Sequence, residues 1–150
     1  MTLEIGSVSS GTLPPQDLLP CFLDLLTTVN RKKSKEIAQE IPDEVYEDDS
    51  NEFWQSDKCQ FIIDDLIVSL NENCPAYCNF ETLYSDGADF GVWINWGAIK
   101  EDIYNKIILE IEDGKEFDFD VRQYSFVLEV NDHGNSILYD RDHNILWSIV

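Results

Sequence analysis

Apolar residues recur at helical spacing in two stretches of the first half of the chain. The first stretch predicts a helix over residues 17–30, and Pro20 inside it leaves a later start open. The second predicts a helix that begins at Ser56 or Asp57, since both residues favour the N-cap position, and that ends before Pro75. The apolar residues of the two stretches are Leu18, Leu19, Phe22, Leu23, Leu25, Leu26 and Val29, then Phe61, Ile62, Leu66 and Leu70.

The second half of the chain mostly alternates between apolar and polar residues, which is typical of strands with one buried face. Residues 99–112 fit a helix and a strand equally well, and both alternatives stay open. Phe117 and Phe119 alternate with acids in residues 116–120. The predicted strands cover residues 77–84, 89–96, 124–131, 135–139 and 145–150. We therefore predict an α+β fold, in which N-terminal helices pack on a mostly antiparallel sheet that ends in a C-terminal β-meander.

The length and composition of the chain predict one folded domain over residues 1–150, with residues 1–14 as a flexible or strand-like lead-in. Hydrophobic residues make up 43% of the chain and aromatic residues 12%, which is enough for a core despite the high charge. The first residues have neither the basic nor the apolar region of a signal peptide, and no apolar run is long enough to span a bilayer. We therefore expect a cytoplasmic protein with reduced thiols at its four cysteines.

The charge of the chain is strongly negative and is concentrated in two segments. Thirty acidic residues against ten basic ones leave a net charge of −20, which repels nucleic-acid phosphates and anionic membranes and attracts a basic protein partner. The acids of residues 43–52, where no basic residue occurs, are Asp43, Glu44, Glu47, Asp48, Asp49 and Glu52. The acids of residues 110–120 are Glu110, Glu112, Asp113, Glu116, Asp118 and Asp120. We predict that both sets bind the partner, the first as the principal one.

The sequence contains short matches to catalytic motifs, but each lacks the accompanying residues that its chemistry requires. Asp89-Phe90-Gly91 matches the metal-binding tripeptide of protein kinases, but the chain has no glycine-rich loop and no catalytic loop to accompany it. Asp43, Asp113 and Lys115 are the residue types of a metal-dependent nuclease site, but they lie far apart in the sequence. A chain with a net charge of −20 would also repel the substrate of a nuclease. Both histidines lie in predicted turns. We therefore predict a protein that is not an enzyme and needs no cofactor.

Metal-ligand patterns are also incomplete in this sequence. Asp140, Asp142 and Asn144 resemble the start of a calcium loop, but Ile145 stands where such a loop requires glycine. A zinc site needs paired ligands, and only two of the four cysteines lie close together in the sequence. We predict no metal site, while divalent-metal binding by the dense acids of residues 43–52 stays as an alternative.

Three regions of the sequence resemble a family of small acidic proteins carried by bacterial phages, prophages and plasmids. They are GTLPPQDLLP at residues 11–20, SDGADFGVW at residues 85–93, and VNDHGN at residues 130–135 with the closing LWSIV at residues 146–150. The resemblance spans most of the chain. It implies a mobile genetic element and the cytoplasm of a bacterial host, and it transfers no activity and no functional residue.

This context and the charge together lead to our first functional hypothesis. Proteins that handle DNA carry basic channels, and a compact domain with rows of carboxylates can occupy such a channel in place of DNA. We therefore expect an anti-defence inhibitor or modulator of a host nucleic-acid-binding protein, acting as a monomer or small homo-oligomer. One alternative is an immunity-type protein that neutralises a basic toxin, and another is a calcium- or divalent-metal-binding protein. A structural component of a virion or plasmid machine is a further alternative, which the self-repulsion of the charge disfavours.

Overall fold

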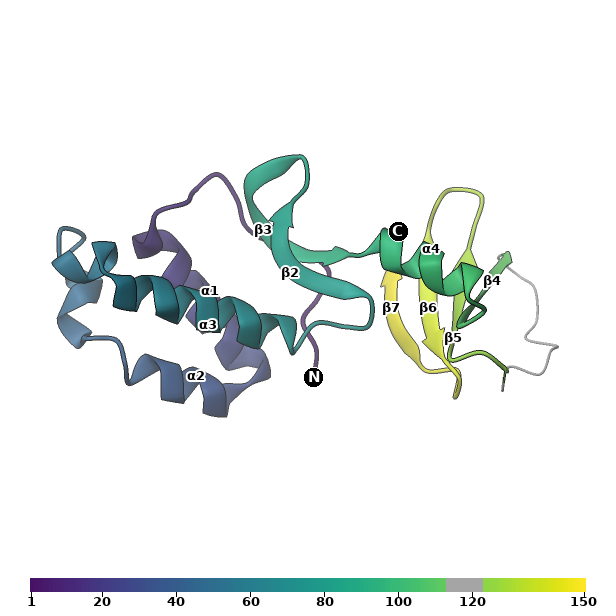
Figure 1. The fold of residues 1–150 in the computed structure, drawn as a ribbon, viewed down its shortest axis with the longest axis horizontal. Helices are drawn as coiled ribbons and strands as arrows, with labels where there is room; N and C mark the ends of the chain where they lie inside the picture. The colour runs from purple at the N-terminus through teal and green to yellow at the C-terminus, as the bar shows by residue number, and fades with distance from the viewer. Residues whose placement is uncertain (113–122) are drawn as a thin grey trace. The chain divides into compact units, whose positions relative to one another are not determined.

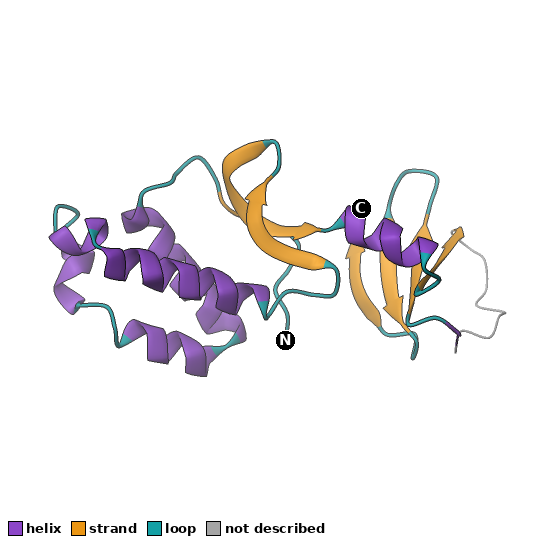
Figure 2. Cartoon of the chain, viewed as in Figure 1, coloured by secondary structure: helices purple, strands orange, loops and turns teal. Residues whose placement is uncertain are grey.

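The computed structural model describes residues 1–112 and 123–150 and confirms the predicted α+β class (Figures 1 and 2). Contacts group the chain into two compact units. The first unit contains residues 1–74 and 78–93, and the second contains residues 75–77 and 94–150. In the described residues, the first unit contains three α-helices and a sheet, and the second contains one α-helix and a sheet. The single domain expected from the chain length stays a prediction.

Three α-helices form most of the first unit: α1 (Pro15–Val29), α2 (Arg31–Ala38) and α3 (Asp57–Asn71). Helix α1 begins two residues before its predicted start and continues through Pro20, so the later start is wrong. The hydroxyl of Ser56 accepts a hydrogen bond from the backbone N–H of Cys59 at 3.1 Å, which confirms Ser56 as the N-cap of α3. The long helices α1 and α3 pack against each other (Figure 1).

The acidic residues 43–52 lie between α2 and α3, in a stretch that contains two short 3-10 helices, η1 (Asp43–Glu47) and η2 (Glu52–Gln55). Neither short helix reaches the length at which backbone hydrogen bonds alone would hold it. Both are therefore held by their tertiary contacts.

A three-stranded sheet completes the first unit, with β1 (Gly6–Ser9), β2 (Cys78–Leu83) and β3 (Asp86–Ile94) in the order β1-β3-β2. Strand β1 is antiparallel to β3, so the N-terminal lead-in is strand-like, as one of the two alternatives predicted. A Cβ atom on Gly91 would lie 2.4 Å from the carbonyl oxygen of Gly6, which explains why glycine occupies this position.

The core of the first unit is aromatic where helix and sheet meet. The ring of Phe22 on α1 makes edge contacts with Phe80 on β2 and with Phe90 on β3, each at a centroid distance of 5.1 Å. Phe22 and Phe80 are fully buried. Such edge-to-face arrangements add to the stabilisation from burial alone.

The second unit contains α4 (Trp96–Tyr104) followed by a four-stranded sheet. Its strands are β4 (Ile108–Glu112), β5 (Phe126–Val130), β6 (Ser136–Asp140) and β7 (Ile145–Ile149), in that order across the sheet. For residues 99–112, where both helix and strand were predicted as alternatives, the structure has a helix that ends at Tyr104 and a strand that begins at Ile108.

Strands β5, β6 and β7 pair antiparallel, which confirms the predicted C-terminal meander. Strands β4 and β5 pair in parallel, and this pairing departs from the antiparallel arrangement of the meander. The alternating residues 116–120 lie outside the described residues.

The short segment of residues 75–77 contributes to the core of the second unit. The indole N–H of Trp147 donates to the carbonyl of Ala76 at 2.8 Å, and the ring of Tyr77 meets that of Phe126 at 5.3 Å. The hydroxyl of Tyr77 donates to the carboxylate of Asp102. Burial, followed by this acidic neighbour, raises the pKa of Tyr77 well above its ordinary value. Tyr77 is therefore a neutral, structural side chain at physiological pH.

Candidate partner-binding surface

All six acids of residues 43–52 are exposed to solvent, and we call this segment the acidic loop. Val45 within the loop and Phe53 and Trp54 just after it are buried, with exposed fractions of 1%, 8% and 4%, whereas Tyr46 is 44% exposed beside the acids. These three anchors hold the acidic loop on the body of the first unit. The separation of carboxylates outward and apolar side chains inward is what a presented charged surface requires.

Hydrogen bonds also fix the backbone of the acidic loop. The indole N–H of Trp54 donates to the carbonyl of Asp48, and the amide of Gln16 on α1 donates to the carbonyl of Asp49, both at 3.0 Å. The carboxylate of Asp48 accepts from the backbone N–H of Ser50 at 3.0 Å and from its hydroxyl at 2.6 Å. Asp48 therefore has a structural role in addition to its charge, whereas no such bond holds the other five carboxylates within the described chain.

The charge of the acidic loop is not neutralised locally. Across residues 1–112 and 123–150, none of its six carboxylates forms an ion pair. The ion pair that the structure does show joins the Lys33 ammonium on α2 to the Asp65 carboxylate on α3, at 3.1 Å. Six unpaired carboxylates in a short ordered segment create a local negative potential that attracts cationic groups.

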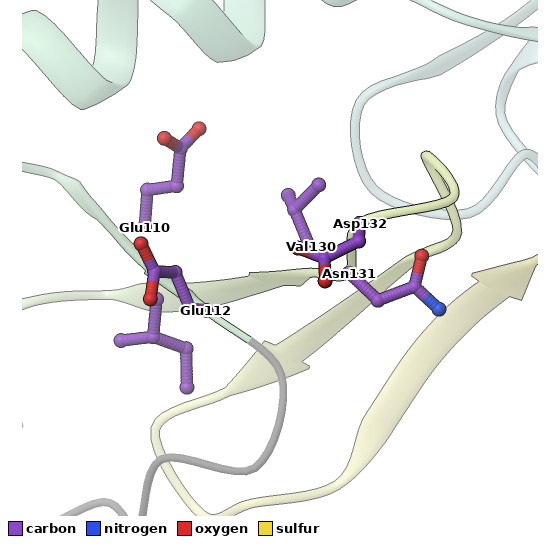
Figure 3. Close-up of a pocket in the computed structure, with 6 residues that line it drawn as sticks. Glu110, Glu112, Val130, Asn131 and Asp132 are labelled. Atoms are coloured by element: carbon purple, nitrogen blue, oxygen red, sulfur yellow. The ribbon is translucent and has the colours of Figure 1, made fainter.

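Two acids of the second predicted set, Glu110 and Glu112, are described, and they lie in the other unit. Both side chains are exposed on β4 and line a recess (Figure 3). The other side of the recess is formed by Val130, the last residue of β5, and by Asn131 and Asp132 after it. Asp113, Glu116, Asp118 and Asp120 lie outside the described residues. The structure therefore brings together the first acidic set on one loop, and it places Glu110 and Glu112 of the second set on a different unit.

The acids that resembled metal-binding or catalytic motifs hold the fold together. The Asp140 carboxylate accepts from the backbone N–H groups of Asp142 and Asn144, at 2.8 and 2.9 Å, and so closes the turn between β6 and β7. Hydrogen bonds from Asn144 lower the pKa of Asp140. The Asp89 carboxylate accepts from the hydroxyl of Ser7 and so ties β3 to β1. In the described part of the chain, no three His, Cys, Asp or Glu residues cluster as metal ligands.

The four cysteines are free thiols. Burial raises the pKa of Cys74 to about 11 and that of Cys78 to about 12, and it also raises the pKa of Cys21 and Cys59. A protonated thiol is a poor nucleophile and a poor metal ligand near neutral pH. Cys59 and Cys78 are buried and pack in the interior, and Cys21 and Cys74 are half-buried.

Helix α3 exposes two apolar side chains whose exposure the sequence pattern did not predict. The side chains of Phe61 and Val68 are 70% and 57% exposed. Phe61 belongs to the apolar pattern that predicted the helix, and Val68 is a further apolar residue of the helix. Their neighbours Ile62, Ile63 and Leu66 are buried. Helix α3 therefore carries more apolar residues than its buried face needs.

Comparison with protein-family models, curated proteins and solved structures finds no match to this chain. The resemblance to proteins of phages and plasmids therefore stays a prediction. None of the helices in the described residues is both long and apolar enough to cross a membrane.

Proposed function

We propose that this chain is an acidic binding protein that inhibits or modulates a nucleic-acid-binding protein, such as a nuclease, of a bacterial host. The observation that carries the proposal is the acidic loop, whose six exposed carboxylates have no cationic partner in the described chain. The net charge of −20 adds a long-range field of the same sign. The binding site of such a partner is a basic groove that normally holds nucleic acid.

The physics of DNA binding supports this choice of partner. Duplex DNA presents one negative charge per about 1.7 Å of its axis, and proteins that bind it neutralise those charges with lysine and arginine. A short loop with six exposed carboxylates offers such a protein a group of negative charges in place of phosphates. Binding should therefore weaken as the salt concentration rises, and duplex DNA should compete for the same groove.

Neutralising the acidic loop should remove this binding without unfolding the chain. The test variant combines Asp43→Asn, Glu44→Gln, Glu47→Gln, Asp49→Asn and Glu52→Gln, and it retains Asp48 because that carboxylate holds Ser50. Five lost charges change the net charge from −20 to −15. The immobilised chain should capture a DNA-binding protein from bacterial lysate. The variant should bind that protein at least about 10-fold more weakly, because each of the five removed charges contributes a few tenths of a kcal/mol to binding.

A matched control neutralises five exposed acids outside both acidic segments. It combines Glu4→Gln, Glu36→Gln, Glu81→Gln, Glu101→Gln and Asp142→Asn, and it also has a net charge of −15. We expect the control to retain the captured partner. Equal losses in the two variants would show that net charge alone acts, and would contradict a binding role for the acidic loop.

The captured partner also distinguishes this proposal from an immunity-type protein. Both use the acidic surface against a basic protein. Release by added duplex DNA supports the inhibitor of a nucleic-acid-binding protein. A captured toxin that duplex DNA does not release would overturn it in favour of the immunity-type function.

A further inference from the structure

One exposed face of α3 combines apolar side chains with carboxylates. Phe61 and Val68 are seven residues apart, which places them on the same side of a helix about 10 Å from each other. They are 70% and 57% exposed, whereas the opposite side of α3 is buried in the first unit. Single exposed apolar residues are common on protein surfaces, but two on one helical face form a surface that a partner can cover.

Carboxylates alternate with these apolar residues along the same face. Asp57 precedes Phe61 by four residues, Asp64 lies between Phe61 and Val68, and Glu72 follows Val68 by four. All three acids are exposed. The amide of Gln60 donates to the Asp64 carboxylate at 2.9 Å, which fixes the orientation of that acid beside Phe61. We call Asp57, Phe61, Asp64, Val68 and Glu72 the α3 face.

The α3 face begins at Asp57, five residues after the acidic loop ends at Glu52. The short helix η2 ends at Gln55 and α3 begins at Asp57, with only the capping residue Ser56 between them. The backbone N–H of Ser56 donates to the carbonyl of Phe53 at 3.0 Å, which fixes the junction. A partner that binds the acidic loop therefore meets the N-terminal end of the α3 face next.

We propose that the α3 face is the apolar anchor of the interface with the basic partner, and this rests on the proposed function. The partner surface that fits it has an apolar recess flanked by lysine or arginine side chains. Charge steers association, but buried apolar side chains at the centre of an interface carry most of the affinity. A second copy of the chain does not fit, because its own acids would face Asp57, Asp64 and Glu72.

Defined peptides can test the anchor without knowledge of the natural partner. The probe is a synthetic helical peptide with leucines on one face and lysines on the other, and the control probe is an oligolysine with the same number of lysines. The variant is Phe61→Ser with Val68→Ser, since serine matches phenylalanine and valine in helix propensity. The control variant, Tyr84→Ser with Ile145→Ser, removes two apolar side chains that are exposed elsewhere.

The double substitution on the α3 face should weaken binding of the amphipathic peptide at least about 10-fold, because the peptide can no longer bury the two apolar side chains. It should leave oligolysine affinity within about twofold, because no charge is removed. The control variant should bind both probes as the unmodified chain does. Circular dichroism establishes that both variants are folded.

Two other outcomes would overturn the inference in different ways. Unchanged peptide binding by the α3-face variant, together with lost binding by the neutralised acidic-loop variant, would refute the anchor and leave the charge-based function standing. Failure of both probes to bind the unmodified chain at low salt would refute the function itself, and the anchor with it.

Discussion

Lys106 shows how a single residue can work against the stability of its element. It lies just after α4 with a positive φ of 62°, a conformation that favours glycine. The backbone N–H of Ile107 donates to the carbonyl of Asp102 at 2.8 Å, and that of Lys106 to Ile103 at 3.1 Å. This pair of bonds defines a Schellman motif, whose left-handed position is usually glycine.

Lys106→Gly should therefore stabilise the protein, by about 0.5–1 kcal/mol, because relief of the left-handed strain exceeds the entropy that glycine loses on folding. The measurement is the urea midpoint of unfolding. Lys100→Gly is the control, since Lys100 is exposed within α4 and its replacement should cost about 1 kcal/mol. A destabilised Lys106→Gly protein would contradict the left-handed conformation of this residue.

At the same scale, single residues explain what the sequence could and could not predict. The cap of α3 could be narrowed from the sequence to Ser56 or Asp57, because a capping side chain binds the neighbouring backbone, which is a local effect, and the structure shows Ser56. The exposure of Phe61 was not predictable, since its helical neighbours Ile62 and Ile63 are also apolar. Where apolar residues surround a helix, only its tertiary neighbours decide which of them is buried.

At the scale of elements, the two turns of the meander use the same hydrogen-bond arrangement with different side chains. In the turn between β5 and β6, the side-chain oxygen of Asn131 accepts from the N–H groups of His133 and Asn135, each at 2.9 Å. Asp140 does the same in the turn between β6 and β7. Each turn also has a residue with positive φ at its fourth position, Gly134 and His143.

The comparison between the two turns predicts a pH effect. Because its folded-state pKa is lowered, Asp140 contributes stability that is present above its ordinary pKa of 3.8 and is lost as the pH falls through the lower folded value. Asp140→Ala should therefore be less stable than the unmodified protein at pH 7, and the difference should shrink below pH 3.8.

Asp140→Asn is the matched variant, since Asn131 already accepts the same pair of bonds in its own turn. It should retain most of the stability at pH 7 and show a weaker dependence on acid. Urea unfolding at pH 7 and below pH 3.8 measures both variants. A pH-independent difference between Asp140→Ala and the unmodified protein would contradict a role for the ionised carboxylate.

Element types followed from sequence wherever local signals were strong. Strands β5 to β7 were predicted because their turn residues and alternation agree. The periodicity of residues 99–112 did not distinguish helix from strand, because helix α4 ends and strand β4 begins within this one segment. The parallel pairing of β4 with β5 is a long-range contact, which periodicity does not encode.

At the scale of the whole molecule, the two units are interleaved along the chain. The chain passes from one unit to the other at residues 74–75, 77–78 and 93–94, so neither unit is one continuous segment. This grouping arises from contacts between residues distant in sequence, and it could not be predicted from length and composition. The predicted single domain requires that both units unfold together.

Leu138→Ala tests this cooperativity. Leu138 is fully buried in the second unit, and its truncation should cost about 2–5 kcal/mol. If the chain is one domain, slow hydrogen exchange at α1 and α3 in the first unit should lose as much protection as at β5 and β6. Loss of protection confined to the second unit would show two independently unfolding domains.

In the proposed function, both the net charge and the acidic loop attract the partner, so the test belongs to the whole molecule. The most direct test is a competition measurement with the purified captured protein, in which duplex DNA is titrated against its complex with this chain. We predict that DNA and the chain exclude each other and that the affinity of the chain falls steeply with salt. A ternary complex with unchanged affinity for DNA would contradict the proposed occupation of a nucleic-acid-binding groove.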